Sequence, residues 1–346
     1  MARRSRSLTG SPAVPFRDVL RAIGPPGVAA EAPLRAAAGR FPVRWTRADL
    51  DLVDPSDPSD PIRRIAFPDP VELVSAPTDL DDPVGERDRT PVPYVVRKHR
   101  DRAVLLVTST CHVYCRFCFR RSFPDGSHRD PDPDALETAL RYVTEDPDLR
   151  EVIVSGGDPL VLPDGELERI VGRLAGSPHL RTVRVHTRAP VHDPDRVTPA
   201  LARALASGLP TWIVTHFDHP REITSDTRRV VDTFLASGLP MLNQAVLLAG
   251  VNDDVDVLEA LFLGLWRERI KPYYLHHPDR VPGAGSFWVH PRRGLELYEA
   301  VRARLGGGPV VPEYVVDLPD GSGKIPVARA LADGRIPGLE DDPAGS

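Results

Sequence analysis

Cysteine is scarce in this sequence, and its few copies are clustered. The 346 residues contain three cysteines, Cys111, Cys115 and Cys118, all in one short stretch. Three cysteines cannot build an even disulfide framework, which argues against a disulfide-stapled secreted protein. Free thiols this close together indicate a reducing compartment, so we expect a cytoplasmic protein.

Long apolar runs and a strong net charge are also lacking. The sequence has no run of about 18 apolar residues, so we expect neither a membrane-spanning segment nor a membrane partner. Its 44 Lys and Arg residues against 49 Asp and Glu residues give a net charge of −5, so we expect no nucleic-acid partner. The basic start, Met1–Arg6, is not followed by the apolar segment of a signal peptide.

Proline, by contrast, is abundant and marks the N-terminal part of the chain. The sequence has 38 prolines, and residues 1–95 combine proline with Asp and Arg while showing weak hydrophobic periodicity. We predict a mostly irregular N-terminal extension that wraps the core or a neighbouring subunit, with partial disorder as the alternative. Short helices are predicted within it at Phe16–Ile23, Ala32–Ala38 and Thr46–Leu52.

Residues 96–330 alternate between short apolar strands and longer amphipathic segments, which predicts one α/β catalytic domain. The predicted strands are Val104–Thr108, Glu151–Ser155, Thr182–Thr187, Trp212–His216, Met241–Leu247, Pro272–His276 and Glu313–Asp317. The predicted helices are Asp132–Val143, Glu166–Leu174, Pro199–Ser207, Asp226–Ala236, Val255–Arg267 and Arg293–Leu305. Six such units favour a parallel sheet with right-handed crossovers, and hence a partial (β/α)6 barrel. Residues 331–346 are expected to form a polar tail.

Polar residues follow the predicted strands at corresponding places. They include the cysteine stretch after the first strand, and three groups that close the next three strands: Ser155–Asp158, His186–Arg188 and His216–His219. Asn243 and Gln244 lie in the fifth strand, and His276–Asp279 follow the sixth. Because ligands of parallel β/α folds bind at the carboxyl ends of the strands, we expect one site along this rim.

The spacing of the cysteines, three residues and then two between neighbours, allows one loop to wrap a metal centre. Three thiolates suit three irons of a [4Fe–4S] cluster and leave the fourth iron open to a small molecule. The amino and carboxylate groups of S-adenosylmethionine are the ligand we expect there. The alternative is a structural zinc site in a non-catalytic protein, which would need His112 or a remote histidine as fourth ligand.

The ordered set of motifs resembles the lysine 2,3-aminomutase family of radical S-adenosylmethionine enzymes. The resemblance extends from about residue 60 to residue 327 and is carried by Arg102, Cys111–Arg121, Ser155–Leu160, His216–Thr224, Asn243–Leu248, Pro272–Tyr274, Val315–Asp317 and Gly323–Val327. It implies an isomerase that uses pyridoxal phosphate and radical chemistry to convert L-lysine to β-lysine. It also implies a reductant such as flavodoxin or ferredoxin, and it is compatible with a homo-oligomer.

The chain departs from the longer family members in one respect. They carry a C-terminal extension whose cysteines bind zinc, whereas this sequence has no cysteine beyond the three in the loop. Its length is closer to that of the short branch, which supplies β-lysine for modifying elongation factor P. Its C-terminal motif, Asp317 to Lys324, looks more like that of the free-lysine enzymes. Arginine and glutamate are the alternative substrates.

Candidate residues for S-adenosylmethionine come from the strand ends. Gly156 and Gly157 lack a Cβ, so the backbone can approach the amino end of the ligand closely. Asp158 completes this motif. His216 and Gln244 are candidates for contact with the adenosine or the pyridine ring.

Candidate residues for pyridoxal phosphate include one of only three lysines. Lys324, in a loop with two glycines, offers a primary amine that can bond covalently to the cofactor and later release it to the substrate. Lys98 and Arg102 are the expected phosphate clamp. Lys271 is the remaining lysine.

Three further residues are candidates for holding the substrate. Arg120 could hold the carboxylate; Arg116 and Arg121 compete for this role, and only the resemblance favours Arg120. Asp279 and Asp317 follow or end rim strands, and two carboxylates close together suit a lysine side-chain ammonium between them. This pair would reject glutamate and would discriminate less strongly against arginine.

Overall fold

The computed structural model describes residues 8–25, 28–122, 129–337 and 339, and its centre is one nine-stranded sheet. The strands lie in sequence order: β1 (Val95–Val96), β2 (Arg102–Thr108), β3 (Glu151–Gly156), β4 (Thr182–His186), β5 (Thr211–Thr215), β6 (Met241–Val246), β7 (Ile270–His276), β8 (Glu313–Leu318) and β9 (Gly323–Pro326). Neighbours from β2 to β8 are parallel, while β1 and β9 pair antiparallel at the edges. The predicted partial (β/α)6 barrel is confirmed.

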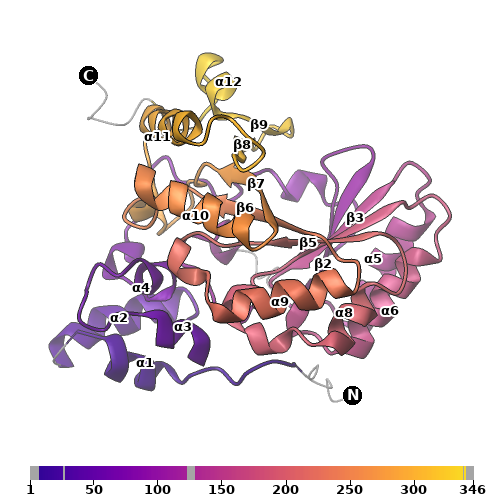
Figure 1. Ribbon diagram of the computed structural model, residues 1–346, viewed down its shortest axis with the longest axis horizontal. Coiled ribbons are helices and arrows are strands. Elements are labelled where there is room, and N and C mark those ends of the chain that lie inside the picture. Colours follow the sequence, from indigo (N-terminus) through magenta and orange to yellow (C-terminus); the bar gives the residue numbers. More distant parts are fainter. Residues whose placement is uncertain (1–7, 26–27, 123–128, 338, 340–346) are drawn as a thin grey trace.

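Helices connect the parallel strands and cover one face of the sheet (Figure 1). They are α5 (Pro133–Glu145), α6 (Asp164–Ala175), α7 (Ala189–His192) with α8 (Pro199–Leu205), α9 (Ser225–Ala236), α10 (Val255–Arg267) and α11 (Pro291–Arg304). Several of these helices begin at a residue whose side chain accepts a hydrogen bond from a backbone N–H group of the first turn: Asp132 caps α5, Thr224 caps α9 and Asp254 caps α10. No helix in the described ranges is long and apolar enough to cross a bilayer.

Burial alternates along the strands, which shows that the two faces of the sheet differ. In β2, Ala103, Leu105 and Val107 are at most 1% exposed and belong to the core beneath the helices. Arg102 and Leu106 point the other way and are partly exposed. The same alternation occurs in β4 and β6. Parallel strands are commonly buried on both faces. The face away from the helices, which we call the inner face, is partly exposed and marks the space available to ligands.

The N-terminal extension is more helical than predicted. It contains α1 (Phe16–Ile23), α2 (Val28–Arg40), α3 (Arg47–Leu52) and α4 (Pro61–Ala66), gathered on one side of the molecule (Figure 1). Their apolar residues form a second core with Val113 and Phe117 of the cysteine loop and with Leu248 and Phe287 from the loops after β6 and β7. The extension therefore packs against the carboxyl-end loops of the sheet.

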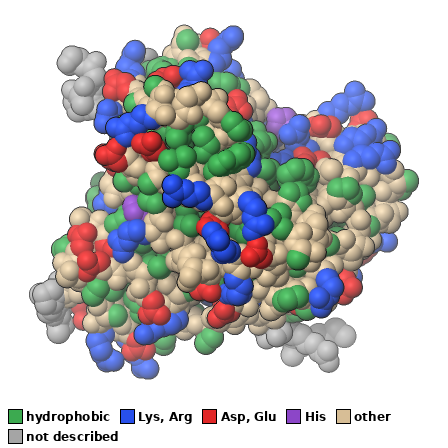
Figure 2. Space-filling model, viewed as in Figure 1, with side chains coloured by type: hydrophobic (Ala, Val, Ile, Leu, Met, Phe, Trp, Pro, Cys, Tyr) green, Lys and Arg blue, Asp and Glu red, His purple; other side chains and the backbone are tan. Residues whose placement is uncertain are grey.

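The C-terminal part differs from the sequence expectation in two places. Lys324 lies in β9, paired with Asp317 of β8, and not in a loop. The predicted tail begins inside α12 (Val327–Ala332), and Ile336 beyond it is 4% exposed in the main core. On the surface, basic and acidic side chains are interspersed over most of the face in Figure 2.

Candidate active site

The three cysteines lie on the loop that leaves β2, and the N-terminal extension holds this loop. Arg116, between two of the cysteines, donates its backbone N–H to the Ile65 carbonyl at 2.7 Å. Its guanidinium, 1% exposed, donates to both oxygens of Glu72 and to the Pro42 carbonyl. Because Glu72 satisfies this guanidinium in the core, Arg116 fixes the loop and is no longer a candidate for the substrate carboxylate.

The thiols share a partly buried, charged environment. Burial raises the pKa of the Cys111 thiol well above its usual value, and the negative charges of Asp158, Cys118 and Cys115 raise this pKa further. Burial also raises the pKa of Cys115, but Arg188 opposes the rise, and Arg188 Nη1 lies 2.7 Å from Cys115 Sγ. The three cysteines lie within eight consecutive residues of one loop, as a cluster bound through all three requires.

The three thiols can serve as ligands of an iron–sulfur cluster. In the described part of the chain, no three His, Cys, Asp or Glu side chains converge as ligands of a single metal ion. A [4Fe–4S] cluster takes each thiolate on a separate iron, so its sulfurs need not converge. Three thiols on one loop with an arginine beside them are a chemically suitable donor set for this anionic cluster, and Cys111, Cys115 and Cys118 would hold it.

The two glycines at the end of β3, Gly156 and Gly157, are required by the packing of the chain itself. Gly156 has a φ of +133°, and a Cβ there would lie 2.1 Å from the Thr108 carbonyl oxygen. A Cβ on Gly157 would lie 2.3 Å from the Thr110 oxygen. Only glycine allows the end of β3 to pack against the start of the cysteine loop. The predicted contact of these glycines with S-adenosylmethionine stays a prediction.

Asp158 ties two strand ends together. Its buried carboxylate accepts hydrogen bonds from the Leu160 and Arg188 backbone N–H groups and from the Thr187 hydroxyl. These bonds use both carboxylate oxygens, so Asp158 positions the rim between β3 and β4. Its predicted direct contact with S-adenosylmethionine also stays a prediction.

The inner face carries a group of histidines beside Gln244. Gln244 Nε2 lies 3.4 Å from His186 Nδ1, and His216 Nε2 lies 3.0 Å from Asp218 Oδ1. The other ring nitrogen of His186 is buried and has no hydrogen-bond partner among the described residues. A buried polar atom without a partner suits a site that a polar ligand fills, so the space beside the cysteine loop fits S-adenosylmethionine.

Several cationic side chains gather around Lys324. Its Nζ lies 3.0 Å from Asp317 Oδ2, and Lys98 Nζ lies 2.8 Å from Asp317 Oδ1. Burial lowers the pKa of His99, and the positive charges of Arg102 and Lys324 lower it further. A partly exposed amine with Lys98 and Arg102 near it fits pyridoxal phosphate, whose aldehyde needs the amine and whose phosphate needs cations.

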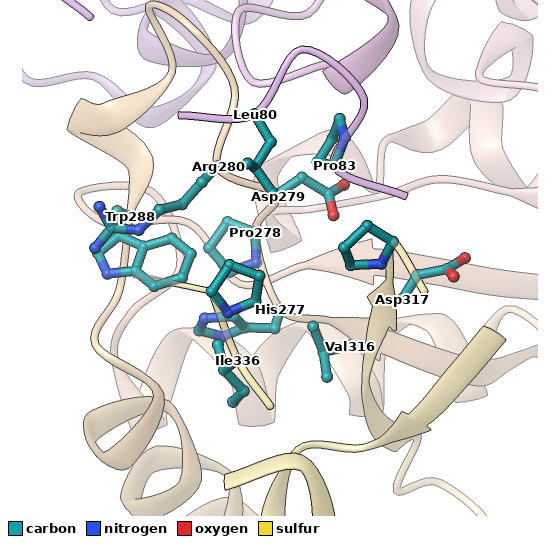
Figure 3. Close-up of a pocket in the computed structure, with 12 residues that line it drawn as sticks. Leu80, Pro83, His277, Pro278, Asp279, Arg280, Trp288, Val316, Asp317 and Ile336 are labelled. Carbon is teal, nitrogen blue, oxygen red and sulfur yellow. The ribbon is translucent and has the colours of Figure 1, made fainter. Parts of the chain in front are cut away.

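Asp279 and Asp317, the two candidate substrate acids, line the same pocket (Figure 3). Leu80 and Pro83 of the N-terminal extension line its other side. Burial raises the pKa of Asp279 to about 7, and the negative charge of Asp317 contributes to the rise. Asp317 has two lysine partners, whereas the Asp279 carboxylate has no hydrogen bond or ion pair within the described residues.

Arg120 already has a partner. Its Nε and Nη2 donate to the two oxygens of Glu86 at 3.0 and 2.5 Å. Nη1 faces the Gly156 carbonyl at 3.5 Å, so this end of the fork lies at the rim. The substrate carboxylate would have to share the guanidinium with Glu86. The side chain of Arg121 lies outside the described residues.

The sequence did not reveal several residues around the thiols. His192 Nδ1 pairs with Asp49 of α3 at 2.7 Å, and His192 Nε2 lies 4.0 Å from Cys115 Sγ. Asp49 and Glu86 lie in the extension, where weak periodicity gave no sign of a site. Arg188 was visible only as a polar residue after a strand.

The chain is similar to a known protein superfamily and to several named enzymes. The Radical SAM superfamily matches residues 105–261. The chain is 41% identical to an L-lysine 2,3-aminomutase of Clostridium subterminale, over 80% of this chain and 67% of that protein. It is 35% identical to an L-lysine 2,3-aminomutase of Haemophilus influenzae, over 82% of this chain and 83% of that protein. It is also 35% identical to a glutamate 2,3-aminomutase of Clostridioides difficile, over 87% of this chain and 74% of that protein.

Proposed function

The chain belongs to the lysine 2,3-aminomutase family of radical S-adenosylmethionine enzymes, and we propose that it converts L-lysine to β-lysine. The observation that supports lysine as the substrate is the pocket lined by Asp279 and Asp317, on the rim that also holds Lys324. Two adjacent carboxylates favour a cation between them. The lysine side-chain ammonium is that cation, because the α-amino group must remain at the reacting end.

The cofactors of the family are a [4Fe–4S] cluster, S-adenosylmethionine and pyridoxal phosphate. When bound, they supply the one-electron activation of a C–H bond and the π-system through which nitrogen migrates. Cys111, Cys115 and Cys118 hold the cluster, and Lys324 holds pyridoxal phosphate with Lys98 and Arg102 at its phosphate. Gly156, Gly157, His216 and Gln244 border the place for S-adenosylmethionine.

The remaining residues orient the substrate and shield it. Arg120 holds the α-carboxylate with one edge of its fork, while Glu86 keeps the other edge in place. Asp279 and Asp317 hold the ammonium at the far end. The N-terminal extension packs over the rim through Leu80 and Pro83, and thereby excludes bulk water from the pocket.

A low-potential electron donor of the flavodoxin or ferredoxin class would reduce the enzyme, and the free thiols suit the cytoplasm. The same proposal includes a homo-oligomer. It also includes a role in the metabolism of free lysine, and not in the supply of β-lysine for elongation-factor modification. The relatives include both lysine and glutamate enzymes. Asp279 and Asp317 are the residues that favour lysine over glutamate as the substrate. Glutamate would place a third carboxylate beside this pair.

Anaerobic turnover tests the proposal. The reconstituted enzyme receives L-lysine, L-arginine or L-glutamate with S-adenosylmethionine, pyridoxal phosphate and dithionite, and mass spectrometry with chiral chromatography identifies the product. We expect β-lysine from lysine, slower turnover of arginine and none of glutamate. Cys118→Ser, which removes an iron ligand, is the inactive control. A preference for glutamate, or zinc in place of iron and sulfide in the active protein, would refute the proposal.

A further inference from the structure

Arg188 stands where β4 ends, and it contacts one cysteine of the loop directly. Its Nη1 donates to Cys115 Sγ at 2.7 Å, and its Nε donates to the His216 carbonyl at 3.0 Å. Asp158 accepts the Arg188 backbone N–H and so fixes the start of the side chain. With an exposed fraction of 9%, Arg188 is largely removed from solvent, where charge interactions are strong.

Two carboxylates balance the charge of Arg188 on its other side. Nη2 lies 2.7 Å from Glu222 Oε1 and 3.3 Å from Asp218 Oδ2. Glu222 is itself fixed, because its Oε2 accepts the backbone N–H groups of Asp218 and His219. The guanidinium therefore interacts with a thiol on one side and with an acidic pair on the other. A change in the acidic pair alters how strongly the positive charge of Arg188 acts on the thiol.

We propose that Arg188 sets the reduction potential of the iron–sulfur cluster by donating to the sulfur of Cys115. This inference rests on the cluster assigned to the three cysteines under the proposed function. Arg188 is a positioning residue here, since it acts through an iron ligand and not on the substrate.

The direction of the effect follows from the charge balance. Reduction transfers one electron from an external low-potential donor to the cluster, and no bond breaks. The added electron makes the cluster with its thiolates more negative, so a nearby cation and hydrogen bonds to sulfur favour the reduced state. Removing Arg188 should make reduction harder, whereas neutralising Glu222 should strengthen the hold of Arg188 on the sulfur and make reduction easier.

Redox titration of the reconstituted protein tests this inference apart from turnover. Cluster reduction is followed anaerobically by electron paramagnetic resonance and visible absorbance, with iron and sulfide content measured for each variant. We expect Arg188→Gln to shift the midpoint to more negative potential and Arg188→Lys, which keeps the charge, to recover part of that shift. Glu222→Gln should shift it to more positive potential. The control is Arg196→Gln, a buried arginine on Leu160 and Leu162 carbonyls with no thiol contact.

Shifts of the midpoint potential in opposite directions for Arg188→Gln and Glu222→Gln distinguish a specific effect on the cluster from general disruption. Disruption would not reverse the sign of the shift. A wild-type midpoint in cluster-loaded Arg188→Gln would overturn the inference. If that variant fails to bind the cluster, Glu222→Gln decides: a positive shift supports the role, and an unchanged or more negative midpoint refutes it. Absence of a [4Fe–4S] cluster from the wild-type protein would instead refute the proposed function.

Discussion

Asp279 is the residue whose protonation is most directly linked to substrate binding. Its pKa of about 7 means that below this pH the carboxyl carries a proton and offers no charge to an ammonium. We therefore expect lysine binding near pH 6 to release close to one proton, and binding near pH 8.5 to release almost none from this group. The affinity for lysine should be full above pH 7 and fall as the pH decreases, approaching tenfold per pH unit.

Calorimetry of the reconstituted enzyme in buffers with different ionisation enthalpies measures the released proton. Asp279→Asn should abolish the release and weaken lysine binding, because the neutral amide cannot pair with the ammonium. With one charge of the pair removed, we expect turnover to fall by roughly two orders of magnitude or more. Proton release that is unchanged in Asp279→Asn would show that another group titrates.

Lys324 gives the second prediction at this scale. Borohydride treatment of the protein with pyridoxal phosphate should fix the cofactor to Lys324, and Lys324→Ala should lose this adduct while keeping its iron and sulfide. Lys271→Ala is the matched control, because Lys271 lies in β7 with its Nζ near the Pro272 carbonyl. Peptide mapping that places the adduct on Lys98 or Lys271 would contradict the assignment.

The arginines show where residue-level prediction stopped. Arg116 and Arg120 are close in sequence, yet Arg116 pairs with Glu72 in the core and Arg120 with Glu86 at the rim. Both partners lie in the extension, and spacing within the cysteine stretch carries no information about them. The cysteines themselves could be singled out because their ligand chemistry depends on a local spacing.

At the scale of elements, the ion pair of Arg116 with Glu72 joins the cysteine loop to the N-terminal extension. Both side chains are 1% exposed, so a lost partner leaves a buried charge without compensation. We expect Glu72→Gln to lower the free energy of unfolding by about 3–5 kcal/mol and to reduce cluster retention. Urea denaturation and iron content measure the two effects.

The exposed pair of Arg47 with Asp51 provides the control for this prediction. Solvent screens it, so Asp51→Asn should change the free energy of unfolding by less than about 0.5 kcal/mol. Equal effects of Glu72→Gln and Asp51→Asn would show that the buried pair does not secure the loop.

Elements with an apolar period could be predicted, and those fixed by distant contacts could not. The parallel strands β2 to β8 and helix α10 follow from local patterns, and α10 matches its predicted bounds. Strand β9 was missed because Gly321 and Gly323 indicate a turn, and both do have positive φ. The ladder that makes the segment a strand depends on its pairing with β8.

At the scale of the whole molecule, the cysteine loop connects the two hydrophobic cores. The loop continues from β2 of the main core, and its Val113 and Phe117 pack in the core of the extension. The sequence indicated an extension that wraps the core or a neighbouring subunit, but it could not show which part the extension covers. Any change that orders this loop must therefore also affect the extension.

Cluster binding should accordingly stabilise the extension more than the distant βα units. A ligand that binds only the folded loop stabilises whatever must be folded to form it. We expect hydrogen exchange to slow markedly in α3 and α4 when the cluster is loaded, because Asp49 holds His192 beside Cys115 and Ile65 accepts the Arg116 N–H. Helices α6 and α8, which pack against each other, serve as the internal reference and should change little. Mass spectrometry of the apo and reconstituted protein gives the comparison. Equal protection of both regions would show that the extension and the loop fold independently.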